Sequence, residues 1–253
     1  MFAMSEQVTD NSWIGAGKMP LEFSYSTSTP PSDFVVATPL DLARRFGDIP
    51  LWRICFDPPP GKATEEECAA INERSDRLCE LVDGTLIEKV MGTFESLIAG
   101  RIVTRLSNYL DAQPKKPGLA LPADGMLKLR IRLIRVPDAS YISRANLKAG
   151  TFPRHGVAAV APTIAVEVIS EGNTQREMQE KLDEYFHYGA AEVWYVYPDT
   201  KTVVRYTARD QQETLAENDT LTTTVLPGFA CPIAPLFVHP DEEFGDMLGE
   251  GNE

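Results

Sequence analysis

One short apolar segment limits the fold of this chain more than any other feature, because it carries a single carboxylate. Residues 162–170 have the sequence PTIAVEVIS, in which Glu167 is the only ionisable residue. A run of Ile and Val with almost no polar interruption is typical of a β-strand that is buried on both faces. Burying an ionised carboxylate is costly unless a cation lies beside it. The sequence therefore predicts a central strand with a charged site at Glu167.

Asp138 and Lys181 are the obvious candidates to complete this site. Asp138 follows a proline upstream of the strand. Lys181 lies 14 residues after Glu167, so a short loop and about two helical turns return its ammonium to the end of the strand. Two carboxylates from adjacent strands form a hard oxygen site suited to Mg²⁺ or Mn²⁺. Waters, and sometimes a strand carbonyl such as that of Val168, fill the remaining positions around the ion. Such an ion binds a phosphodiester oxygen and activates a bound water.

The same residues have structural interpretations that the sequence leaves open. Asp138 after a proline is typical of a turn, and Lys181 is typical of a solvated helix face. Tyr185, four residues after Lys181, shares its helix face and either supports it or packs in the core. A solitary buried carboxylate is harder to explain without a function, so Glu167 is the strongest indication of a site.

Hydrophobic periodicity predicts an α/β order of elements. Thr64 and Glu67 form a capping box at the start of one helix, and Asp83-Gly84 is typical of a hairpin turn. The predicted helices cover residues 39–46, 64–78, 94–110 and 174–188. The predicted strands are two short ones around the turn within 80–88, followed by 127–133, 138–142, 162–170, 193–197, 201–207 and 221–226.

Changes in composition along the chain indicate four regions. Residues 1–36 form a leader rich in Ser, Thr, Pro and Gly, 37–79 a helical N-terminal extension, 80–239 the main domain, and 240–253 an acidic tail. The four cysteines show no metal-ligand spacing, and the N-terminus lacks the pattern of a signal peptide. No apolar stretch approaches the roughly 20 residues that span a bilayer. We therefore expect a reduced, cytoplasmic protein without a membrane partner.

The positive charge of this acidic chain is concentrated in one segment. The net charge is −13, yet residues 128–154 contain seven Lys and Arg residues against one Asp. Within residues 127–133 the basic residues alternate with apolar ones, so one face of the predicted strand is core and the other basic. The basic face either binds DNA phosphates or only protects a strand edge from aggregation. The residues expected to contact DNA are Lys128, Arg130, Arg132, Arg135 and Arg144.

Five segments, taken together and in this order, carry a family resemblance. The chain resembles the Uma-two-like restriction endonucleases, a branch of the PD-(D/E)XK nuclease superfamily, over residues from about 80 to 206. The matching segments are ELVDG at 80–84, VPD at 136–138, EVIS at 167–170, KLDEY at 181–185 and GAAEVWYVYP at 189–198. Each is weak by itself, but five in the right order are fairly specific.

The resemblance implies a fold and a set of site residues. The fold is a restriction-endonuclease-like mixed central sheet flanked by helices, with Asp138 and Glu167 as metal ligands and Glu80 as the early acidic residue near the metal. The lysine usually found two residues after the second carboxylate is Ile here, and Lys181 replaces it. Glu95 stands where family members commonly carry a histidine. A carboxylate there serves as an outer contact to metal-bound water but cannot donate as an imidazolium does.

The expected function is that of an endonuclease that hydrolyses DNA phosphodiester bonds with a water activated by Mg²⁺ or Mn²⁺. The expected partners are DNA and a second copy of the chain in a homodimer. The alternative is a binding or scaffold protein that keeps the nuclease fold and has lost catalysis. The acidic net charge and the carboxylate at position 95 favour this alternative, whereas the retention of two carboxylates and a lysine favours the enzyme.

Overall fold

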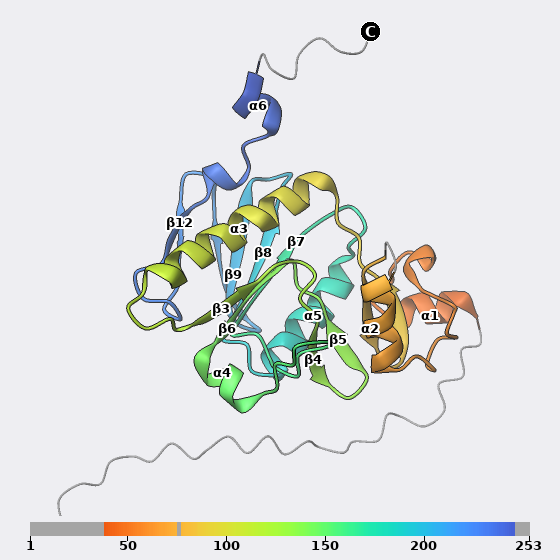
Figure 1. Ribbon diagram of the computed structural model, residues 1–253. Helices are drawn as coiled ribbons and strands as arrows, with labels where there is room; N and C mark the ends of the chain where they lie inside the picture. Colours follow the sequence, from red (N-terminus) through yellow and green to blue (C-terminus); the bar gives the residue numbers. More distant parts are fainter. Residues whose placement is uncertain (1–37, 75–76, 246–253) are drawn as a thin grey trace, which may run out of the picture.

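The computed structural model describes residues 38–74 and 77–245, so the leader predicted for 1–36 and the end of the predicted acidic tail lie outside the described residues. Figure 1 shows the order of the elements. The helices are α1 (Pro39–Arg45), η1 (Leu51–Arg53), α2 (Glu65–Arg74), α3 (Thr93–Ala112), α4 (Arg144–Ala149), α5 (Gln175–His187), η2 (Ala234–Leu236) and α6 (Pro240–Phe244). The strands are β1 (Cys79–Val82), β2 (Thr85–Glu88), β3 (Gly118–Leu121), β4 (Leu127–Arg130), β5 (Leu133–Arg135), β6 (Ala139–Ser143), β7 (Ile164–Val168), β8 (Glu192–Tyr197), β9 (Thr202–Ala208), β10 (Gln211–Leu215), β11 (Thr220–Thr222) and β12 (Ala230–Pro232).

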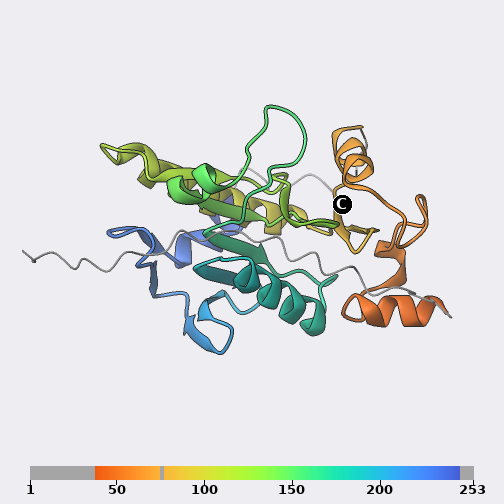
Figure 2. The same ribbon diagram turned by 90° about the horizontal axis from the view of Figure 1, so that it is seen from below.

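The main sheet has six strands in the order β10-β9-β8-β7-β6-β3. Only β7 and β8 run parallel in this sheet, and α5 connects them. A second sheet has the order β2-β1-β5-β4, and β11 and β12 form a pair of their own. The N-terminal helices α1 and α2 lie at one end of the molecule in both views (Figures 1 and 2). The fold is therefore mixed α/β, as the sequence predicts.

Helices α3 and α5 cover opposite faces of the main sheet, and this decides where Glu167 points. Val166 and Val168 of β7 pack in the core cluster that contains the apolar stripe of α3. Ala165, on the other face, packs with Met178 and Leu182 of α5. Because successive side chains of a strand point to opposite faces, Glu167 lies on the α5 side with Ala165. All five residues of β7 are buried, as predicted from the apolar run.

Most predicted elements are confirmed, with their local signals. The Thr64 hydroxyl accepts from the Glu67 amide at 3.2 Å while the Glu67 carboxylate accepts from the Thr64 amide at 2.8 Å, which is the predicted capping box. Asp83 and Gly84 both have positive φ, 49° and 76°, and close the β1–β2 hairpin. The stripe at 94–110 lies within α3, whose buried residues recur at helical spacing. No helix in the described part of the chain is long and apolar enough to cross a membrane.

The single strand predicted for 127–133 is wrong. The segment is a hairpin, in which β4 pairs antiparallel with β5 across a turn at Ile131 and Arg132. Arg132 adopts a φ of 61°, and Ile131, expected in the core, is 63% exposed at the tip. Alternation cannot reveal a two-residue turn that lacks Gly, Asn and Pro, because the period of two continues across it. The sequence pattern also missed β3, β10 and α4.

Candidate active site

Glu80 is held by the strand that lies beside it. Strand β1 pairs antiparallel with β5, which brings Arg135 and Val136 to the Glu80 carboxylate. The Arg135 guanidinium contacts Glu80 Oε2 at 2.7 Å and Glu184 Oε2 at 2.6 Å, and the Val136 amide donates to Glu80 Oε1 at 3.0 Å. Burial alone raises the pKa of Glu80, but the charges of Lys181 and Arg135 lower it well below its ordinary value. Glu80 is therefore ionised.

Asp138 and Glu167 meet at the ammonium group of Lys89. Strand β6 pairs with β7, with Ala139 opposite Val166, so Asp138 lies beside the end of β7. The Val168 amide donates to Asp138 Oδ2 at 2.6 Å and fixes this carboxylate. Lys89 Nζ lies 2.8 Å from Asp138 Oδ1 and 3.9 Å from Glu167 Oε2. The two carboxylates therefore converge on one cation from two neighbouring strands.

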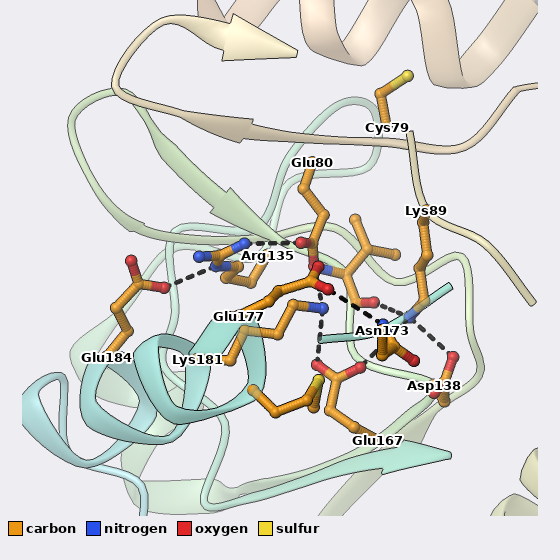
Figure 3. Close-up of polar contacts among 12 residues, drawn as sticks. Cys79, Glu80, Lys89, Arg135, Asp138, Glu167, Asn173, Glu177, Lys181 and Glu184 are labelled. Carbon is orange, nitrogen blue, oxygen red and sulfur yellow. Dashed lines mark hydrogen bonds and ion pairs between the residues drawn. The ribbon is translucent and has the colours of Figure 1, made fainter. Parts of the chain in front are cut away.

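Lys181 lies on the other side of Glu167. Its ammonium is 3.2 Å from Glu80 Oε1 and 3.4 Å from Glu167 Oε1, and the Tyr185 hydroxyl donates to the same Glu167 oxygen at 2.6 Å. Burial lowers the pKa of Lys181, but Glu167 and Glu80 raise it above its ordinary value, so the lysine stays charged. Burial and the charge of Glu167 raise the pKa of Tyr185, which stays protonated as a donor. Lys181 thus links Glu80 to Glu167, as Figure 3 shows.

The cluster is almost completely removed from water. Glu80, Asp138, Glu167, Lys181 and Arg135 are each at most 4% exposed. The side chain of Lys89 is 5% exposed. Among these six buried side chains, three carboxylates are balanced by two ammonium groups and one guanidinium, and the partly exposed Glu184 adds a fourth carboxylate at Arg135. Burial raises the pKa of Glu167 and outweighs the lowering effect of Lys181 and Lys89.

Arg53 joins the N-terminal extension to the loop and helix that follow β7. Its guanidinium makes two bonds to the Glu177 carboxylate, at 2.7 and 2.8 Å, and the two side chains are 1% and 6% exposed. The same group donates to the carbonyls of Glu88 and Gly172, each at 2.9 Å. Arg53 therefore holds Glu88, the residue before Lys89, in a fixed position relative to the first turn of α5. Sequence reasoning missed Arg53.

The family model described as "Putative restriction endonuclease", named Uma2, matches residues 65–234, which is more than half of the chain. The chain belongs to the Uma2 family. A solved structure, a putative nuclease belonging to DUF820 from Anabaena variabilis ATCC 29413, matches with a TM-score of 0.57 and 19% sequence identity. The match covers 69% of this chain and 97% of that chain, and it shows the restriction-endonuclease-like fold. No curated protein matches.

The Uma2 chain brings the predicted Asp138, Glu167, Glu80 and Lys181 together. Glu95 lies in the first turn of α3, and no contact joins it to the cluster within the described residues. The structure adds Lys89, which the sequence analysis did not name. The sequence signal for Lys89 is its position directly after β2. Strand β2 pairs with β1, which carries Glu80.

The carboxylates of Asp138 and Glu167 suit a hard cation, but they do not form a complete set of metal ligands by themselves. Two carboxylate oxygens, from Asp138 and Glu167, already face one cationic group, and Mg²⁺ is bound by one or two carboxylates with waters. Glu80 is instead turned toward Arg135 and Lys181. Accordingly, no group of three or more His, Cys, Asp or Glu side chains arranged around a metal position is found among the described residues. Val168 contributes its amide, to Asp138.

The predicted DNA surface needs correction at Arg135, which is 4% exposed and belongs to the buried cluster. The β4–β5 hairpin carries three of the other four predicted cations, and these three contact the protein itself. Lys128 pairs with Glu65, and Arg130 with Asp83 at 2.6 Å. The Arg132 guanidinium donates to the Gly61 carbonyl. Arg144, in α4, is exposed.

A cavity of about 360 Å³ reaches the edge of the buried cluster at Arg135 and Glu184. Its polar lining is mostly acidic, because Arg45 and Arg135 face five carboxylates, those of Asp83, Glu177, Glu180, Asp183 and Glu184. A wall with this excess of negative charge repels a phosphodiester. This wall is therefore not suited to bind a nucleic-acid backbone.

Proposed function

We propose that this Uma2 chain is a metal-dependent endonuclease that hydrolyses phosphodiester bonds of DNA. The observation that carries the proposal is the convergence of Asp138 and Glu167 on one cation position, at 2.8 and 3.9 Å from the same Nζ atom. A buried cluster of acids and cations that only stabilised the fold could be replaced as a whole by apolar residues at little cost. Membership of a family described as a restriction endonuclease points to the same chemistry.

Asp138 and Glu167 would hold the Mg²⁺ or Mn²⁺ ion. When bound, this ion supplies a water of lowered pKa and stabilises negative charge on the phosphate. The Val168 amide orients Asp138 for this task, and Tyr185 orients Glu167. Lys181 keeps Glu80 and Glu167 in place and adds a fixed positive charge in a water-excluded site.

The DNA surface in this proposal is the β4–β5 hairpin with Arg144 of α4. The side chains of the Lys128–Glu65 pair are 26% and 22% exposed, and those of the Arg130–Asp83 pair are 37% and 25% exposed. These pairs are only partly buried, so water weakens them, and a phosphate competes with the carboxylate for each cation. A homodimer remains a prediction, which light scattering on the purified protein tests.

One observation favours the second candidate function, a nuclease-fold scaffold without catalysis. Protein cations contact all three carboxylates of the cluster, and Lys89 takes the position between Asp138 and Glu167. A site that is already neutral has no electrostatic need for a metal ion. The two candidates differ in one respect that is simple to measure, the cleavage of DNA with added metal.

The experiment is a plasmid cleavage assay with Mg²⁺ or Mn²⁺, with and without a chelator. Glu167→Gln keeps the size of the side chain and removes its charge, and Glu171→Gln is the matched control because Glu171 is exposed just after β7. We expect cleavage by the wild type and the control and none by Glu167→Gln or in chelator. Equal cleavage by Glu167→Gln, or none by the wild type with either metal, refutes the proposed function.

A further inference from the structure

The Lys89 ammonium lies among three oxygen atoms from two segments of the chain, 136–138 and strand β7. It donates to the Val136 carbonyl and contacts Asp138 Oδ1 at 2.8 Å and Glu167 Oε2 at 3.9 Å. A carbonyl and two carboxylates are the hard oxygen ligands that Mg²⁺ and Mn²⁺ take in proteins. Figure 3 shows the side chain reaching from the end of the β1–β2 hairpin toward Asp138 and Glu167.

We propose that Lys89 is the resident cation of this site and that a divalent ion binds by displacing its ammonium. The inference rests on the proposed function, because it takes Asp138 and Glu167 as the metal ligands. It adds a specific role for a lysine that lies outside the predicted set. In this role Lys89 keeps the site closed and neutral until metal arrives.

Lys89 and a metal ion exclude each other because they use the same oxygen atoms. A Mg²⁺ ion bonded at about 2.1 Å to Asp138 Oδ1 lies within a few Å of any ammonium that still contacts this atom. Two cations at that separation repel strongly in a buried site, where screening by water is weak. With Lys89 in place the charges of the six buried side chains already balance, so a divalent ion would add two positive charges to a cluster that has no further buried carboxylate for them.

Lys89, and not Lys181, contacts both of the proposed metal ligands. Lys89 lies one residue after β2, and its ammonium is a point charge on a four-carbon stem with several rotatable bonds. Lys181 lies in the middle of α5, and its ammonium contacts Glu80 and the other oxygen of Glu167. No contact between Lys181 and Asp138 is found in the described part of the chain. The lysine that yields to the metal is therefore Lys89.

The first experiment measures Mn²⁺ binding directly, by electron paramagnetic resonance of free Mn²⁺ and by calorimetry. Lys89→Met removes the competing charge with little change of volume, and Lys115→Met is the control because Lys115 is exposed. We expect Lys89→Met to bind Mn²⁺ at least about tenfold more tightly than the wild type, which is about 1.4 kcal/mol. We expect its unfolding midpoint without metal to fall, and Mn²⁺ to raise that midpoint by more than in the wild type. Unchanged or weaker Mn²⁺ binding overturns the proposal.

The second experiment uses the wild type, so it does not depend on a variant that folds. An acylating reagent labels accessible lysines, and mass spectrometry gives the rate at each site with and without Mn²⁺. We expect Mn²⁺ to accelerate labelling of Lys89 while Lys181 stays protected. Equal Lys89 labelling at Mn²⁺ saturation overturns the inference and leaves the proposed function standing. Absence of Mn²⁺ binding in both wild type and Lys89→Met overturns both.

Discussion

Removing the Arg53 guanidinium tests whether the contacts of residues 37–79 with α5 and β2 stabilise the fold. The change is Arg53→Met, which keeps much of the volume and leaves the Glu177 carboxylate buried without its partner. The side chain loses four hydrogen bonds, two to Glu177 and one each to the carbonyls of Glu88 and Gly172. Breaking a buried ion pair by removing one partner costs about 3–5 kcal/mol. We expect the free energy of unfolding to fall by that amount.

The assay is urea denaturation followed by tryptophan fluorescence and circular dichroism. The control is Arg176→Met, because Arg176 pairs with Asp48 at 3.4 Å on the surface, where both side chains are 56% exposed. Exposed pairs contribute at most about 1 kcal/mol, so the control should lose little. The double variant Arg53→Met with Glu177→Gln should lose less than Arg53→Met alone, because no buried charge remains. A loss below about 1 kcal/mol in Arg53→Met refutes the reasoning.

The pH dependence of the same pair gives an independent check. Burial raises the pKa of Glu177, but the bonds from Arg53 and the charge of Lys181 lower it below its ordinary value. The stability that an acid with a lowered pKa contributes is full above its unfolded value of about 4.3 and is lost as the pH falls. Wild-type protein should therefore lose stability below about pH 4.3, and Arg53→Met should lose less over that range. Parallel curves would contradict this assignment.

Three further predictions concern single positions. Gly47→Ala should destabilise the protein by more than Gly61→Ala, because both glycines have positive φ, 83° and 80°, but an added Cβ at Gly47 meets the backbone of α5 at 2.5 Å and at Gly61 meets nothing within 4 Å; equal losses in thermal unfolding would contradict the clash. Tyr185→Phe should cost about 1.5–3 kcal/mol in urea denaturation, since it removes a 2.6 Å bond to the Glu167 carboxylate; a neutral result would mean that the hydroxyl is dispensable. Arg130→Ala should flatten the salt dependence of duplex binding by roughly one unit of log K per log salt, measured with Ca²⁺ to suppress cleavage; an unchanged slope removes this residue from the DNA surface.

Local patterns in the sequence determined most of the elements and part of the site. The stripe of α3, the capping box at Thr64 and the Asp83-Gly84 turn depend on neighbours within a few residues, so their signals survive without the fold. Glu167 belongs to this group, because a lone acid in a run of Ile and Val is expensive wherever the strand lies. The fold class followed from the order of such elements and from the family resemblance.

Tertiary structure alone decided which charges meet. Lys89 and Asp138 are 49 positions apart, and only the pairing of β1 with β5, the strand just before Asp138, brings them to 2.8 Å. Arg135 looked like one more surface cation in a basic segment, yet β5 buries it against Glu80. Arg130 is partly exposed, as the sequence suggests, but it forms an ion pair with Asp83 of the β1–β2 hairpin. Charge acts through space, and separations along the chain do not give separations in space until the strands have paired.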